Sequence, residues 1–276
     1  MKRRLLRLSV TLLALFLAAG ASFAQDATKS ASDEAAELAK KLSNPVAALI
    51  SVPFQNNFEF GGGPNDDGFR YLLNFQPVIP ISLNTNWNLI SRTILPVISQ
   101  DDVTGSGTSQ TGIGDIVQSF FFSPKAPSAG GWIWGVGPVV LIPTGSNNAL
   151  TGDKWGMGPT AVALKQESGW TYGALANHIW SFDGHDDRSD ISSTFLQPFL
   201  SYTTKDAWTY ALNTESTYNW KTSQWTVPVN AVVSKVTKFG DQLVSVGGGV
   251  RYWADGPNSA PEGLGFRFIV TLLYPK

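Results

Sequence analysis

The chain has 276 residues, a formal net charge of −1 and no cysteine, so disulfides, thiolate metal sites and cysteine nucleophiles are excluded. Charged residues make up only 15% of the chain and aromatic residues 12%, which suits a surface that meets lipid as well as water. The lack of a basic excess argues against nucleic acid as a partner.

The N-terminus has the pattern of a secretory signal peptide. Basic residues within the first seven positions precede an apolar run over residues 8–19, and the small residues Ser22 and Ala24 follow where signal peptidase cleaves. The run is shorter than the roughly 20 residues that span a bilayer as a helix, so a retained membrane anchor is the weaker interpretation. We predict a signal peptide over residues 1–24, whose removal takes the net charge from −1 to −5.

One helix is predicted in the mature chain, over residues 32–42. It contains strong helix formers, with acidic residues in the first turn and lysines in the last, as the helix dipole favours. The pattern stops at Asn44-Pro45. Because the apolar face is thin, we expect residues 25–45 to be a periplasmic segment that caps or partly plugs the rest of the protein.

From residue 46 onward, runs rich in β-branched and aromatic residues are separated by clusters of Gly, Asn, Asp, Ser and Pro. The runs are residues 47–60, 69–83, 87–99, 111–123, 131–143, 154–166, 170–182, 191–204, 208–221, 225–239, 243–253 and 263–274. The breaks between them alternate broadly between long and short. Outer-membrane barrels have this asymmetry, with short periplasmic turns and longer external loops.

The run over residues 208–221 indicates which kind of β protein this is. Its even positions carry Trp208 and Tyr210 at one end and Tyr218 and Trp220 at the other, while its odd positions are mostly polar. Side chains alternate across a pleated strand, so the aromatics would share one face. Aromatic residues paired at both ends of a strand match the two interfacial girdles of a transmembrane barrel.

The last run, residues 263–274, alternates in the same way. It resembles the aromatic C-terminal signal that is read by the barrel-assembly machinery, although Pro275 and Lys276 follow it. We therefore predict an all-β protein in which residues 46–276 form an antiparallel transmembrane β-barrel of about twelve strands in the outer membrane. A soluble exported β-sandwich or a lipocalin-like binding protein is the alternative.

Prolines inside the predicted strands argue against this interpretation, because each removes a hydrogen bond from the ladder and a closed barrel has no edge strand to absorb them. Either bulges accommodate several of them, or the strands are shorter than predicted. They are Pro53, Pro77, Pro80, Pro96, Pro138, Pro159, Pro198 and Pro228.

Several stretches carry a family resemblance. They are Asn44-Pro-Val-Ala-Ala-Leu-Ile, Asn74-Phe-Gln-Pro-Val-Ile-Pro, Trp87-Asn-Leu-Ile-Ser-Arg-Thr-Ile-Leu-Pro, Gly137-Pro-Val-Val-Leu-Ile-Pro-Thr-Gly, Lys154-Trp-Gly-Met-Gly-Pro-Thr and Tyr172-Gly-Ala-Leu-Ala-Asn-His-Ile-Trp-Ser-Phe. With them the chain resembles bacterial outer-membrane proteins labelled as transporters, sometimes mislabelled neuromedin U, and akin to those found with phenol meta-cleavage pathways. The resemblance implies an outer-membrane barrel with a transport role and hints at hydrophobic or aromatic solutes. It supplies no functional residues.

Catalysis finds little support in the sequence. An outer-membrane phospholipase with a similar number of strands uses Ser, His and Asn on its barrel wall, so Asn177, His178 and Ser181 are a candidate set. Alternation along a strand puts both Asn177 and Ser181 on the face opposite His178. We therefore predict that the protein is not an enzyme and that His178 has a structural or lumenal position.

Metal and cofactor sites are not predicted either. The acid-rich loop from Asp183 to Asp190 could offer oxygen ligands to Ca²⁺, but it lacks the spacing of an EF-hand and is better interpreted as a solvated loop. Residues 144–152 share only their glycine content with a phosphate-binding loop, since no Gly-Lys-Ser/Thr ending is present.

The candidate site is a set of charged residues inside the predicted strands. They are Glu59, Arg70, Arg92, Asp115, Glu215, Arg251 and Arg267. An arginine that faces lipid near mid-membrane costs roughly 2–4 kcal/mol, so we expect these residues to face the lumen. They form either a paired network that fills a narrow barrel or the lining of a solute path. Glu215 is expected to pair with Arg251 or Arg267, because its neighbours on the same face are neutral.

The predicted function is passive or facilitated passage of small molecules across the outer membrane. A structural barrel with a closed lumen is the competing class. The expected partners are outer-membrane lipid, the barrel-assembly machinery and a small solute that the sequence does not name, with no nucleic acid and no cofactor.

Overall fold

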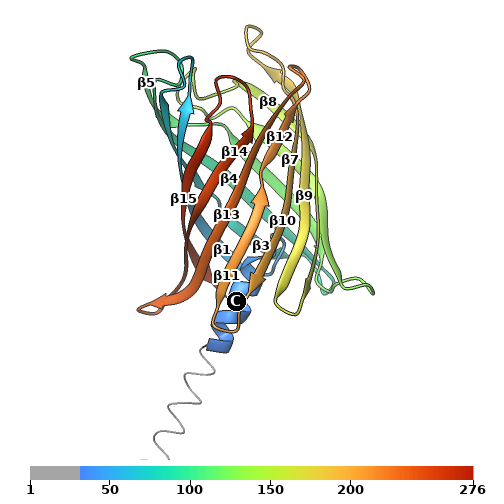
Figure 1. The fold of residues 1–276 in the computed structure, drawn as a ribbon. Helices are drawn as coiled ribbons and strands as arrows, with labels where there is room; N and C mark the ends of the chain where they lie inside the picture. Colours follow the sequence, from blue (N-terminus) through green and yellow to red (C-terminus); the bar gives the residue numbers. More distant parts are fainter. Residues whose placement is uncertain (1–31, 276) are drawn as a thin grey trace, which may run out of the picture.

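The structure is a computed structural model that describes residues 32–275. These residues form one closed antiparallel β-barrel with a short helix, residues 32–42, at one end (Figure 1). The predicted signal peptide lies outside the described residues, as do the residues between it and position 32. Within the described range no helix is long and apolar enough to cross a membrane.

Fifteen strand segments make up the barrel wall. They are β1 (Ile50–Gly62), β2 (Gly68–Phe75), β3 (Val78–Ser82), β4 (Trp87–Asp101), β5 (Ser109–Ile113), β6 (Ile116–Pro124), β7 (Trp132–Ile142), β8 (Lys154–Glu167), β9 (Trp170–Gly184), β10 (Ser192–Thr203), β11 (Trp208–Thr214), β12 (Ser216–Asn219), β13 (Gln224–Phe239), β14 (Gln242–Asp255) and β15 (Gly263–Tyr274). The pairs β2 and β3, β5 and β6, and β11 and β12 each continue one interrupted strand, so the wall has twelve strands. Pairing of β1 with β15 closes the barrel, and the predicted fold class is confirmed.

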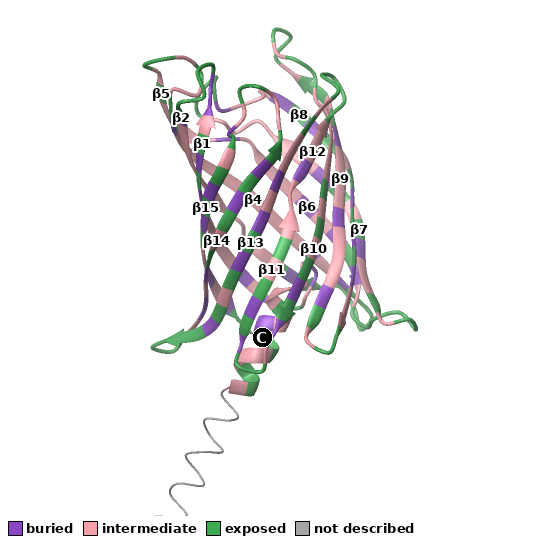
Figure 2. Cartoon of the chain, in the orientation of Figure 1, coloured by how far each residue is buried: buried purple, intermediate pink, exposed green. Residues whose placement is uncertain are grey.

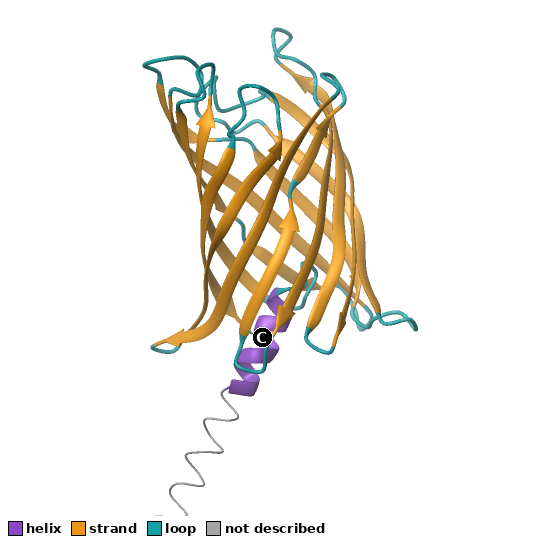
Figure 3. Ribbon diagram, viewed as in Figure 1, coloured by secondary structure: helices purple, strands orange, loops and turns teal. Residues whose placement is uncertain are grey.

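The two ends of the barrel differ, as the alternating breaks in the sequence predict. Four of the five connections at the end that holds the helix and the C-terminus, which we call the turn end, have two to four residues, and the fifth is residues 125–131. The six connections at the opposite end, which we call the loop end, have four to eleven residues (Figure 3). The turn between β8 and β9 has positive φ at both of its residues, Ser168 (50°) and Gly169 (85°). This is the geometry of a two-residue hairpin whose twist matches that of its strands. At the loop end, residues 143–153 between β7 and β8 form the longest connection.

Prolines explain where the three strands are interrupted. At each break a backbone N–H donates to the carbonyl of a proline in the neighbouring strand, and the proline has no N–H with which to return the bond. The pairs are Gln76 with Pro53 (2.9 Å), Gly114 with Pro96 (2.9 Å) and Glu215 with Pro228 (3.2 Å). Pro228 also adjoins a register shift between β13 and β14. Breaks and a bulge therefore accommodate part of the proline set within a closed barrel.

Large apolar side chains point outward around the barrel. In β15, Phe266 is 52% exposed and the neighbouring Arg267 is 3% exposed, and Figure 2 shows similar alternation along other strands. Aromatic contacts lie near both ends, between Trp170 and Tyr202 (5.0 Å between ring centroids) and between Tyr218 and Trp225 (4.9 Å). An apolar belt bounded by aromatics is typical of a transmembrane barrel. It reverses the pattern of a soluble sandwich, whose aromatic faces would lie between two sheets.

Candidate functional site: the barrel lumen

The N-terminal helix fills the turn end of the lumen. Its buried residues Leu38 and Ala39 pack against Leu273 of β15 in an apolar cluster. On the opposite wall, the side chain of Gln166 in β8 donates a hydrogen bond to the carbonyl of Lys40 (2.8 Å). Because β8 and β15 lie on opposite sides of the twelve-stranded wall, the helix reaches across the lumen and occupies the position of a plug.

The segment that follows the helix covers a second apolar cluster inside the barrel. Val46 packs there with Ile90 of β4, Phe121 of β6 and Leu175 of β9. The Asn44 side chain fixes the turn before it, since Asn44 Oδ1 accepts a hydrogen bond from the Val46 N–H (3.0 Å). Ile90 and Phe121 are fully buried, so this side of the lumen is filled with apolar side chains near the plug.

A charged network centred on Glu215 lies between the plug and the loop end. The Glu215 carboxylate accepts two parallel hydrogen bonds from Arg267 of β15 (2.9 and 2.8 Å) and one from Arg251 of β14 (2.6 Å). Two parallel N–H···O bonds are the bidentate geometry that makes arginine–carboxylate pairs strong and directional. Both arginines considered in the sequence as partners for Glu215 therefore contact it.

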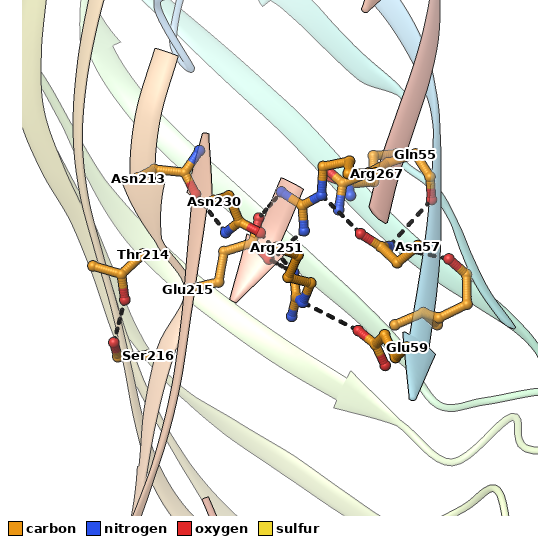
Figure 4. Close-up of polar contacts among 12 residues, drawn as sticks. Gln55, Asn57, Glu59, Asn213, Thr214, Glu215, Ser216, Asn230, Arg251 and Arg267 are labelled. Carbon is orange, nitrogen blue, oxygen red and sulfur yellow. Dashed lines mark hydrogen bonds and ion pairs between the residues drawn. The ribbon is translucent and has the colours of Figure 1, made fainter. Parts of the chain in front are cut away.

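Glu59 extends the network to β1 and β2. Its buried carboxylate accepts a hydrogen bond from Nε of Arg70 (2.6 Å), and its other oxygen lies 3.1 Å from Nε of Arg251. Arg251 thus contacts both carboxylates and links the two halves of the network (Figure 4). A single guanidinium group holds together strands that are far apart in the sequence.

Three asparagines complete the network. Asn57 accepts a hydrogen bond from Nε of Arg267 (2.7 Å), while Asn230 accepts one from Arg251 (3.2 Å) and donates one to Asn213 (2.9 Å). Asn57 bonds the Nε of Arg267, which the Glu215 carboxylate leaves free, and this matters because an unpaired polar group in a buried network is costly.

The network carries one net positive charge, because it contains two carboxylates and three guanidinium groups. Its members come from one continuous part of the wall, which runs from β11 through β13, β14, β15 and β1 to β2. The charges are paired in a buried setting, where removal of one partner costs several kcal/mol. The network therefore stiffens this side of the wall and narrows the lumen.

Two adjoining cavities lie between the network and the plug. The central cavity, of about 270 Å³, reaches from Glu215 and Arg267 to Leu42 of the helix. The inner pocket, of about 170 Å³, extends from Leu42 to Arg92 of β4. Gln76, at the break between β2 and β3, borders both. A solute that passed the network would enter these spaces before it reached the helix.

Arg92 faces the inner pocket and stands apart from the network. Among residues 32–275 its side chain makes one hydrogen bond, to Oε1 of Gln76 (3.2 Å), and it has no ion pair. Five of the predicted lumen charges thus contact one another, and Arg92 does not join them.

Asp115 also lies outside the network, at the break between β5 and β6. Its carboxylate accepts hydrogen bonds from the Gly145 N–H (3.0 Å), the Thr151 hydroxyl (2.6 Å) and the Gly152 N–H (2.7 Å). Asp115 shares the inward face of its strand with Phe121, so the loop that it binds is drawn toward the mouth of the lumen. Asp115 therefore holds a loop and not an arginine.

Asp115→Ala is expected to release the loop over residues 143–153. It removes a charged acceptor of three hydrogen bonds, and one such bond contributes about 1.5–3 kcal/mol, so we expect proteolysis of this loop to be roughly tenfold faster or more. The measurement is limited proteolysis of the lipid-embedded protein with cleavage sites mapped by mass spectrometry. Asp241→Ala, at an exposed acid in the β13–β14 turn, is the control. Equal cleavage rates would show that Asp115 does not restrain the loop.

The candidate catalytic set is not assembled. His178 shares the outer face of β9 with Trp180, whose ring centroid lies 4.0 Å from that of the imidazole, and its Nδ1 is 2.7 Å from the Thr194 hydroxyl. Among the described residues, neither Asn177 nor Ser181 bonds to it. The position of His178 is structural, and the lumenal alternative is wrong.

The acid-rich loop after β9 is open to solvent. His185 and Asp187 are both exposed, with 3.5 Å between His185 Nδ1 and Asp187 Oδ1. In the part of the chain that the structure describes, no three His, Asp or Glu side chains converge in a way that could hold a metal ion.

The neutral amides of the lumen were not predicted from the sequence. Asn57 and Asn230 bond the arginines of the network, and Gln76 bonds Arg92. The available signal was alternation, since Asn57 shares a strand face with Glu59. For Gln76 the signal was its position before Pro77, where the ladder breaks.

The comparisons with known proteins agree with this architecture. An outer membrane channel from Pseudomonas putida F1 has a similar structure, with a TM-score of 0.63 and 14% sequence identity over 82% of this chain and 94% of that chain. No curated protein sequence is significantly similar. A family model described as "Putative MetA-pathway of phenol degradation" matches residues 67–260, well over half of the chain. The resemblance to outer-membrane proteins found with phenol-degradation pathways is thereby confirmed, and the chain belongs to this family.

Proposed function

We propose that the protein lies in the outer membrane and lets small molecules pass through its barrel, passively or by facilitated diffusion. The observation that carries this proposal is a closed barrel with an apolar outer surface and a lumen that contains cavities. The strands are long enough for it, since β9 has 15 residues and β13 has 16, against about 9–11 for a tilted strand that spans the hydrocarbon core.

The proposed solutes are small apolar or aromatic molecules. The family description names phenol degradation, and the similar solved structure is called an outer membrane channel. The central cavity supports the same class, because Val232, Ile269 and Phe199 line it beside polar groups. Most ligand sites combine apolar walls with a few placed polar groups in this way. This role needs no catalytic group, and we propose none.

Passage requires the lumen to widen, and the helix is the element suited to move. The network is held by charge-assisted hydrogen bonds, which are about twice as strong as neutral ones. The helix is held by apolar contacts and by neutral hydrogen bonds from Gln166 and from Ser32, whose hydroxyl lies 3.4 Å from the Lys205 carbonyl. A shift of the helix would open the turn end and leave the network intact.

The partners follow from the location. Outer-membrane lipid would cover the apolar belt, and the barrel-assembly machinery would insert the chain through its last strand, where Phe266, Phe268 and Tyr274 point outward. The net charge of the chain gives no support for nucleic acid as a partner.

Planar-bilayer conductance and liposome uptake test the function. We expect stepwise conductance from the purified barrel and faster uptake of neutral aromatic solutes into proteoliposomes than into liposomes that carry heat-unfolded protein. Outer-membrane location is tested by cell fractionation with heat-modifiable gel migration. A folded barrel in the outer membrane that gives neither conductance nor uptake would be a structural barrel, and the transport proposal would fail.

A further inference from the structure

We infer that the inner pocket binds a small organic acid, with its carboxylate on Arg92 and its apolar body against the walls. This deepens the proposed function and rests on it, since the pocket matters only if solutes reach it. It adds a charged group to the solute class, which the family description does not imply.

The charge of the pocket is the first argument. Its lining includes Arg92 and Lys41 and no acidic side chain. Glu215 attracts Arg92 from beyond ion-pair distance, but the Glu215 carboxylate is already bonded to Arg251 and Arg267. A half-buried cation without an ion-pair partner favours an anion in the adjoining space. Within residues 32–275, the protein itself does not supply that anion at ion-pair distance.

The geometry of Arg92 is the second argument. A guanidinium group has five N–H donors in a planar fork that matches a carboxylate, and one hydrogen bond to Gln76 leaves most of them for an occupant. Gln76 is fixed in turn, because its backbone N–H donates to the Pro53 carbonyl at the break between β2 and β3 (2.9 Å). Gln197 of β10 also borders the pocket and offers a further amide donor. The strand break thus builds one wall of the site.

The apolar lining and the size are the third argument. Leu42, Val78 and Leu175 form the walls around the polar groups. The pocket, of about 170 Å³, is close to the roughly 150 Å³ of an engineered protein cavity that binds benzene. An inorganic anion would leave these walls uncovered, and a neutral hydrocarbon would leave the charge of Arg92 without an ion-pair partner. A one-ring or short-chain carboxylate satisfies both requirements.

Equilibrium binding of benzoate tests the site. The full-length mature protein is placed in lipid nanodiscs, and binding of radiolabelled benzoate is measured by dialysis alongside benzyl alcohol and formate. We expect benzoate to bind at least tenfold more tightly than either of these probes. Arg92→Gln is expected to weaken benzoate binding at least tenfold and to leave benzyl alcohol binding unchanged. Arg92→Lys keeps the positive charge but loses the planar guanidinium fork. Its affinity for benzoate should lie between those of the unchanged protein and the Arg92→Gln variant.

Lys125→Gln is the matched control, because it removes one positive charge from an exposed position at the turn end. It should bind benzoate as the unchanged protein does, and heat-modifiable migration verifies that each variant is folded. Equal binding of benzoate by the Arg92→Gln variant would overturn the inference, and so would formate binding as tight as that of benzoate. If the protein binds benzoate but gives no solute flux, the transport proposal is wrong and the assignment of the pocket still holds.

Discussion

Glu215→Gln is expected to lower the unfolding free energy of the barrel by about 3–5 kcal/mol, the usual cost of removing one partner from a buried ion pair. The substitution leaves Arg267 without an ion-pair partner in the described part of the chain, because Glu215 is the carboxylate that it contacts. Arg251 keeps its ion pair with Glu59. The measurement is urea unfolding in lipid vesicles, followed by the loss of heat-modifiable migration. Glu262→Gln, at an exposed acid of the loop end, is the matched control and should change little.

The double variant separates pairing from simple loss of a charge. Adding Arg267→Gln to Glu215→Gln is expected to recover about 1 kcal/mol or more, since directly contacting residues couple by about 0.5–3 kcal/mol. Adding Arg251→Gln to Glu215→Gln should recover less unfolding free energy. This second change removes the Arg251 contact of Glu59 and leaves Arg70 as the only ion-pair partner of Glu59 among the described residues. Strictly additive effects would mean that water solvates these charges independently and that the lumen is wide and open at this level.

Deletion of residues 32–44 is expected to raise single-channel conductance severalfold. The helix and the turn after it fill the width of the lumen at the turn end, and the cavities above them would then open to the periplasm. The wall should still close, because pairing of β1 with β15 begins at Ile50 and does not involve the helix. Planar-bilayer recording of the deleted and complete chains is the measurement.

The control for the deletion is Glu34→Gln, which changes an exposed position of the helix and leaves its packed face intact. It should conduct as the complete chain does. An unchanged conductance after the deletion would place the narrowest part of the path at the arginine network, and the helix would then have no gating role.

The strands were predictable because lipid imposes a period of two on the outer face of the wall. The run predicted over residues 154–166 is β8 (Lys154–Glu167), and the last run has the bounds of β15. The breaks were not predictable, because each depends on a proline in a different strand. Glu215 lies at a break since Pro228 is its neighbour, and one sequence does not reveal that register.

The candidate site was predictable in part for the same reason. Alternation placed Glu215, Arg251 and Arg267 on the inner face, and strand order brought their strands near one another. Alternation does not tell how far a side chain lies along the barrel. Asp115 therefore looked like a member of the network, although it lies near the loop end and binds backbone N–H groups of a loop.

The apolar cluster formed by the helix and β15 bears on the order in which the barrel assembles. It joins Leu38, in the helix, to Leu273, near the end of the last strand, so it links residues separated by almost the whole described chain. Contacts between such distant residues form late, since the ends of a long loop must first be brought together. The helix also contacts Ala207, Val236 and Gln166, but its contact with Leu273 requires the last strand, β15, to be in place. The full set of contacts that hold the helix in the lumen is therefore complete only when the last strand has been added to the wall.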